Sequence, residues 1–150
     1  MTASEIPPLD GTEPKTAIAL SPPESFAAIL LLIVAADGQL TASEASLLEA
    51  TLGQMHLFRG YPADFLPQTV AKLCQTLRVQ GQEALLMAAL ASLPRDLYDT
   101  TYAIALDLAL VDTGIGPEEQ QILDRLQAAT GLQTEVVELL QWAMTIKHKG

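Results

Sequence analysis

Apolar residues recur along most of this chain at the three- and four-residue spacing of a helix that is buried on one side. Leu48, Leu52 and Met55 illustrate this spacing. Residues 26–36 differ, because they form an unbroken apolar run without a polar face. We therefore expect a helix over residues 22–36 at the centre of the fold, covered by other helices on every side.

Capping residues, prolines and glycines divide the remaining chain into helices. Ser21 and Thr41 are each followed three residues later by a glutamate, the capping box that opens a helix. Pro117 begins a helix and Gly131 ends one. No segment shows the alternating β-branched pattern of a strand. The sequence predicts an all-α, single-domain bundle of about seven helices, over residues 22–36, 41–56, 63–79, 82–93, 94–111, 117–130 and 134–147.

The N-terminal segment has a different composition. Residues 1–21 contain Pro7, Pro8 and Pro14 and lack a periodic apolar pattern. Such a segment buries too little apolar surface to offset the entropy of ordering it. We interpret residues 1–21 as a flexible tail and residues 22–150 as one helical domain, a size that fits a single core.

The chain is strongly acidic, with 18 Asp and Glu against 8 Lys and Arg and a formal net charge of −10. This charge repels phosphate backbones and anionic lipids, so we expect no nucleic-acid partner and no membrane insertion. The longest apolar run, residues 26–36, is shorter than the roughly 20 residues that span a bilayer. No basic segment precedes it, which argues against a signal peptide and predicts a cytoplasmic protein. Cations or a basic protein surface are the natural complements of this charge.

Two loops share one pattern of carboxylates. A shift of 75 positions places Asp37 on Asp112 and Glu44 on Glu119, with an aliphatic residue between the members of each pair. An apolar helix is predicted before each loop and an amphipathic helix after it. The repeat therefore predicts two related helix-loop-helix halves, each with two carboxylates at a helix start.

These four acids allow two interpretations. Calcium and magnesium prefer carboxylate and backbone oxygens, so each loop is a candidate site for one of these ions, more than for zinc. Alternatively, Glu44 and Glu119 satisfy unpaired amides at helix starts, and Asp37 orders its own turn. Gly38 follows Asp37 directly and permits a left-handed turn, so we expect any cation affinity to lie in the first loop.

Asp107 is a further candidate ligand. It interrupts residues 102–111, an otherwise apolar stretch. A buried carboxylate needs a partner or a shifted pKa. A backbone amide or a hydroxyl of a neighbouring helix is the ordinary partner, and a bound cation is the alternative.

Residues with catalytic chemistry are scarce. The sequence lacks a Glu-x-x-His pair, a glycine-rich phosphate loop and a serine elbow, and His148 lies in the C-terminal end, where fraying is expected. Cys74 is the single cysteine, so it forms neither an internal disulfide nor a thiolate metal site. We therefore expect no enzymatic activity and no cofactor beyond a divalent cation. Trp142 and Met144 fit the core of the last helix, with a partner-binding surface as the alternative.

Residues 36–44, Ala-Asp-Gly-Gln-Leu-Thr-Ala-Ser-Glu, resemble the Ala-Asp-Gly loop of the tellurite-resistance protein TerB and of TerB-like domains. Such domains also occur in DnaJ-type membrane co-chaperones. Residues 81–119 are similar to the second half of the family, although Thr113 replaces the glycine expected after Asp112. The likeness covers roughly residues 22–133.

The resemblance implies an all-helical fold with two related halves and a cytoplasmic role in tellurite or chemical-stress resistance, beside other stress-resistance proteins. Carried onto this sequence, the acidic positions are Asp37, Glu44, Asp112 and Glu119. The first expected function is a scaffold that binds or senses a divalent cation on an acidic face. The alternative is a co-chaperone-like interaction module that binds no metal and uses this face on a basic partner. A homodimer is compatible with both.

Overall fold

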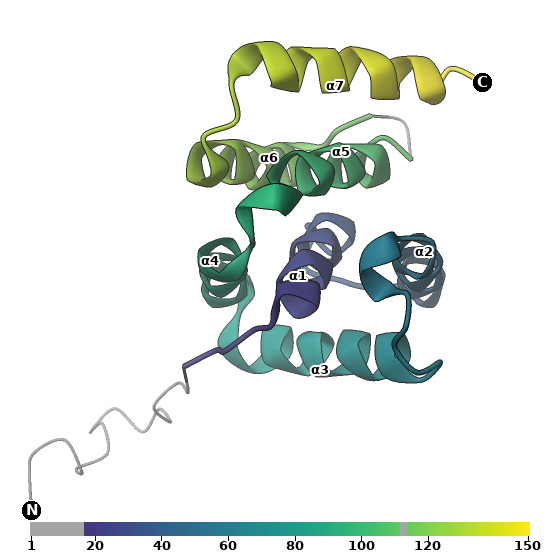
Figure 1. Ribbon diagram of the computed structural model, residues 1–150, viewed down its shortest axis with the longest axis vertical. Coiled ribbons are helices and arrows are strands. Elements are labelled where there is room, and N and C mark those ends of the chain that lie inside the picture. The colour runs from purple at the N-terminus through teal and green to yellow at the C-terminus, as the bar shows by residue number, and fades with distance from the viewer. Residues whose placement is uncertain (1–16, 112–113) are drawn as a thin grey trace, which may run out of the picture.

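The computed structural model describes residues 17–111 and 114–150 (Figure 1). The described residues form seven α-helices and no strand, which confirms the predicted all-α class. None of these helices is long and apolar enough to cross a lipid bilayer. The helices are α1 (Pro22–Val34), α2 (Ala42–Gly53), α3 (Phe65–Gln80), α4 (Gln82–Ser92), α5 (Tyr98–Ala109), α6 (Pro117–Thr130) and α7 (Thr134–Lys147), with 3-10 turns η2 (His56–Phe58) and η3 (Arg95–Leu97).

Helix α1 lies at the centre of the bundle, with α2, α3, α4 and α5 packed around it (Figure 1). Every residue from Phe26 to Ile33 is at most 1% exposed. Burying a large apolar side chain contributes about 1.5–3 kcal/mol, so α1 supplies a large share of the core energy. The prediction that residues 26–36 form the most buried helix is confirmed.

Local signals set most helix boundaries as predicted. The Ser21 and Thr41 hydroxyls accept hydrogen bonds from the backbone amides of Glu24 and Glu44. In return, each glutamate carboxylate accepts a hydrogen bond from the backbone amide of its capping residue. Helix α6 ends at Gly131, which has the left-handed φ of 70°. Helices α1, α2 and α5 end two or three residues before the predicted positions, and α3 begins two residues late. The largest difference is that α5 begins at Tyr98 instead of residue 94, because Pro94 is extended and η3 intervenes.

Helix α7 forms an outer layer that packs on α5 (Figure 1). Val137 is buried and Met144 packs against the core. Trp142, by contrast, is 68% exposed, so the prediction that it belongs to the core is wrong. Residues 1–16 of the predicted N-terminal tail lie outside the described residues.

Candidate functional site

The first loop connects α1 to α2 and presents Asp37 and Glu44. Asp37 is exposed, and its Oδ1 accepts a hydrogen bond from the Gln39 amide at 3.0 Å. Gly38 has φ 90°, the left-handed conformation that the sequence predicts there. Glu44 is half-buried, and its Oε1 accepts the Thr41 amide at 2.9 Å. Both carboxylates therefore order the chain around a turn and a helix start, as the capping interpretation expects.

The second loop connects α5 to α6 and presents Glu119. Its Oε1 accepts a hydrogen bond from the Gly116 amide at 2.8 Å, which is the glutamate half of a capping box. Glycine lacks a side chain, so the reciprocal half is missing here. Asp112, the partner that the repeat assigns to Glu119, lies outside the described residues.

The first loop and the starts of α2 and α6 meet at one cleft of about 160 Å³. Glu44 comes from the start of α2, and Glu118 and Glu119 come from the start of α6. A second cleft of about 210 Å³ adjoins it and shares Glu44 and Glu119. We call the first space the acidic cleft; it is lined by Ile33, Val34, Ala36, Asp37, Glu44, Glu118 and Glu119.

The acidic cleft combines an apolar floor with a negative rim. Ile33, Val34 and Ala36 form the floor. Among the described residues, no Lys, Arg or His lines this cleft or the adjoining one. Carboxylates gathered near one another repel, and a cationic group placed between them relieves the repulsion. The cleft is therefore suited to a positively charged ligand that also carries apolar surface.

The kind of cation that a site holds depends on how many oxygen ligands it offers. In the part of the chain that the structure describes, no three side chains of His, Cys, Asp or Glu lie close enough to share one metal ion. Calcium takes six to eight oxygen ligands at about 2.3–2.6 Å, and magnesium about six at 2.0–2.1 Å. A lysine or arginine head group needs only one or two carboxylates at hydrogen-bond distance.

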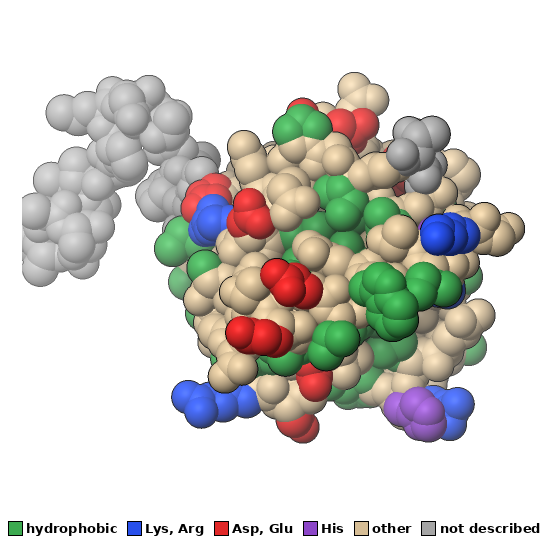
Figure 2. Space-filling model, turned by 90° about the horizontal axis from the view of Figure 1, so that it is seen from above, with side chains coloured by type: hydrophobic (Ala, Val, Ile, Leu, Met, Phe, Trp, Pro, Cys, Tyr) green, Lys and Arg blue, Asp and Glu red, His purple; other side chains and the backbone are tan. Residues whose placement is uncertain are grey.

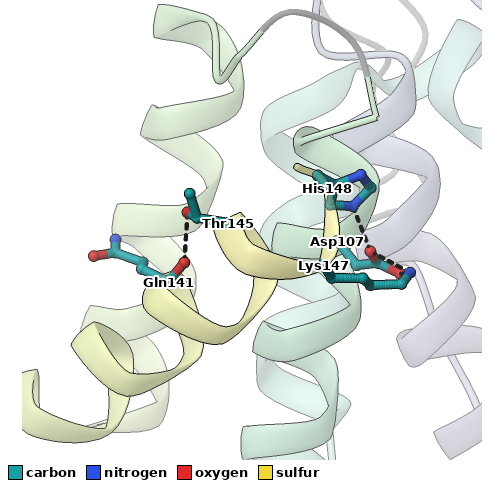
Figure 3. A network of polar contacts seen from close by, with 5 residues as sticks. All are labelled: Asp107, Gln141, Thr145, Lys147 and His148. Atoms are coloured by element: carbon teal, nitrogen blue, oxygen red, sulfur yellow. Dashed lines mark hydrogen bonds and ion pairs between the residues drawn. The ribbon is translucent and has the colours of Figure 1, made fainter. Parts of the chain in front are cut away.

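Asp107, the fifth candidate ligand, has other partners (Figure 3). Lys147 Nζ lies 2.8 and 2.9 Å from its two carboxylate oxygens, and His148 Nε2 lies 2.7 Å from Oδ1. An ionised carboxylate only accepts, so this ring nitrogen carries the proton. The predicted backbone or hydroxyl partner is replaced by two side chains of the C-terminal end, and His148 is held in place. This cluster ties the end of α7 to α5.

Opposing effects set the pKa of Asp107. Burial raises the pKa, but the hydrogen bonds from Lys147 and His148 lower it by a larger amount. The net pKa therefore lies below the ordinary carboxyl value. Asp107 is therefore ionised at neutral pH and neutralised by its own chain. It lines neither of the two clefts between the helix starts.

A larger cleft of about 510 Å³ borders the first loop and shares Asp37 and Glu118 with the acidic cleft. It is lined by residues 35–40 and by parts of α3 and α4, including Arg78. Cys74 forms part of its wall, and burial raises the pKa of that thiol. A protonated thiol is a poor nucleophile and a poor metal ligand. Gln82 donates a hydrogen bond to the Ala35 carbonyl at 3.2 Å and closes one side.

Glu118 is the cleft residue that sequence reasoning missed. The 75-residue shift places it on Ser43, so the repeat gives no reason to select it. The available signal was its position beside Glu119 in the first turn of α6. Carboxylates in the first turn of a helix lie close together near the free backbone amides of that turn.

Comparison with protein-family models, with curated proteins and with solved structures finds no match to this chain. The likeness of residues 36–44 to the TerB loop therefore stays a prediction.

Proposed function

We propose that this chain is a TerB-like helical scaffold of chemical-stress resistance that binds a basic segment of a partner protein in the acidic cleft, without catalysis. The family part rests on the resemblance of residues 36–44 to the Ala-Asp-Gly loop. The binding part rests on one observation, the lining of the cleft by Asp37, Glu44, Glu118 and Glu119 over an apolar floor.

A lysine or arginine side chain fits this lining better than a small ion does. Its aliphatic stem covers apolar surface while its charged head stays at the polar edge. Val34, which is half-buried, is the floor residue that can contact the stem, and the acidic rim suits the head group. The formal net charge of −10 adds a long-range attraction for basic partners.

Calorimetric titration with a hexa-arginine peptide tests the proposal. A double variant, Glu44→Gln with Glu118→Gln, removes two charges from the cleft, and the glutamine at position 44 retains an oxygen that can cap α2. Asp64→Asn with Asp96→Asn removes the same charge from exposed positions outside the cleft. We expect the first pair to weaken binding about tenfold or more and the second to have little effect. Equal losses would show non-specific attraction and contradict the proposal.

A divalent cation is the second candidate ligand, favoured by the left-handed turn at Gly38 and by Asp37 and Glu44 lining one cleft. Titration with calcium or magnesium chloride tests it. The cation proposal expects measurable affinity that Asp37→Asn weakens, while stability in EDTA hardly changes. Equal affinity in the parent and in Asp37→Asn, or no binding of either ion, would contradict it.

A further inference from the structure

Three large apolar side chains of α7 face solvent: Leu139 is 65% exposed, Trp142 68% and Ile146 46%. Their spacing of three and four residues places them on one face of the helix. Figure 2 looks down on this side of the molecule and shows hydrophobic side chains gathered between acidic and basic ones. We call these three residues the α7 stripe. A contiguous apolar face on an outer helix marks a contact surface.

Charges flank the α7 stripe with opposite signs at its two ends. Glu135 and Glu138 are exposed in the first half of α7. Lys149 is exposed just after its end, where its amide donates to the Ile146 carbonyl at 3.2 Å. Glu135 precedes Leu139 by four residues, so it shares the face of the stripe. Lys147 belongs to the inner side, because Asp107 holds it.

We propose that the α7 stripe binds the α7 stripe of a second copy of this chain, as an antiparallel pair with its two-fold axis near Trp142. A two-fold axis perpendicular to the helix places each residue opposite a residue of the second copy that lies equally far from the axis, toward the other end of the helix. Leu139 then faces the partner's Ile146, and the acidic first half of α7 faces the partner's Lys149. The surface is complementary to its own reversed copy in both apolar and charged positions.

The charge pattern favours an antiparallel pair over a parallel pair and over an anionic membrane surface. A parallel pair of helices sets Glu135 beside the same residue of the other copy and repels. An antiparallel pair also aligns the helix dipoles favourably. An anionic membrane is repelled by Glu135, by Glu138 and by the net charge of −10.

The size of the surface predicts a reversible dimer. Helix α7 has 14 residues, which corresponds to a length of about 21 Å. Stable interfaces bury roughly 800 Å² on each partner, and a single helix face of this length supplies clearly less, which is typical of weak, transient pairs. We therefore expect monomer and dimer to exchange in the micromolar range, with Trp142 as the main energetic contact.

Trp142 is the single tryptophan of the chain, so its fluorescence reports this face directly. As the concentration of full-length protein rises, we expect its emission to shift to the blue while sedimentation velocity shows conversion of monomer to dimer. Leu139→Glu should weaken the dimer at least a hundredfold, because the change acts twice in a symmetric pair. Met87→Glu is the matched control, since Met87 is 58% exposed on α4, and it should leave dimerisation unchanged. Circular dichroism verifies that each variant is folded.

Charge reversal tests the antiparallel arrangement. Glu135→Lys and Lys149→Glu should each weaken the dimer about tenfold, and the double variant should restore it, because the swapped charges attract again across the axis. A monomer at all concentrations, or equal effects of Leu139→Glu and Met87→Glu, would overturn the proposal. A blue shift that requires phosphatidylserine vesicles, instead of higher protein concentration, would overturn it in favour of a membrane surface. A double variant weaker than both single variants would overturn the antiparallel pairing.

Discussion

Asp107→Asn tests how the outer helix is attached to the bundle. The substitution keeps the shape of the side chain and removes the charge that faces Lys147 and His148 at 2.7–2.9 Å. Hydrogen bonds to charged groups contribute about 1.5–3 kcal/mol, whereas exposed ion pairs contribute about 0.2–1 kcal/mol. The Asp107 side chain is 19% exposed and that of Lys147 is 59% exposed, which places this cluster between those cases. We expect a loss of about 1–2 kcal/mol at pH 7, or about 2–8 °C in Tm.

The effect of Asp107→Asn should depend on pH in a defined direction. The folded pKa of Asp107 is lowered from its ordinary value of 3.8. A lowered pKa means that the carboxylate stabilises the fold above the unfolded pKa and loses this contribution as the pH falls through the folded pKa. The difference in stability between the parent and Asp107→Asn should therefore persist from pH 7 down to about pH 4 and shrink below it.

Urea unfolding followed by circular dichroism, repeated from pH 7 to about pH 2.5, measures this difference. Amide hydrogen exchange in α7 then shows whether the loss is local to that helix. Asp124→Asn is a matched control, because Asp124 is exposed on α6 and accepts a hydrogen bond from the neutral Gln120 side chain at 2.9 Å. Equal stability of the parent and Asp107→Asn at pH 7, or a difference that stays constant down to pH 2.5, would refute the reasoning.

Three further predictions concern the core, the caps and the N-terminal segment. Leu31→Asp should prevent folding, because an unpaired charge at a fully buried position costs several kcal/mol; a folded variant by circular dichroism would show that this side of α1 meets solvent. Glu44→Ala should lower the free energy of unfolding by about 0.5–2 kcal/mol and Glu44→Gln by less, since the amide oxygen can still accept from Thr41; equal losses in urea would exclude the capping role. Removing residues 1–16, which are proline-rich and lack an apolar face, should leave the Tm unchanged; a large drop in calorimetry would show that this segment docks on the bundle.

The fold could be predicted largely because its signals are local. Ser21 and Thr41 carry their capping glutamates three residues away, and Gly131 ends its helix by its own conformation. The late start of α5 was missed because a proline such as Pro94 suits the first turn of a helix and an extended segment equally well. The exposure of Trp142 was missed because α7 carries apolar residues on both faces, and only packing decides which face is covered.

The candidate site could be predicted only in part, because its geometry depends on distant contacts. The repeat selects Asp37, Glu44 and Glu119, but their convergence depends on α1 packing against α5, which spacing within each loop does not encode. The partners of Asp107 lie 40 and 41 residues away along the chain, beyond any local pattern.

Nuclear magnetic resonance titration of the full-length protein with the hexa-arginine peptide tests the central claim most directly. We expect the largest shifts at the starts of α2 and α6, around Glu44, Glu118 and Glu119, and we expect these shifts to saturate and to disappear in the Glu44→Gln, Glu118→Gln double variant. Shifts spread over all acidic surfaces, or unchanged in that double variant, would contradict the claim that the cleft between the starts of α2 and α6 is the binding site.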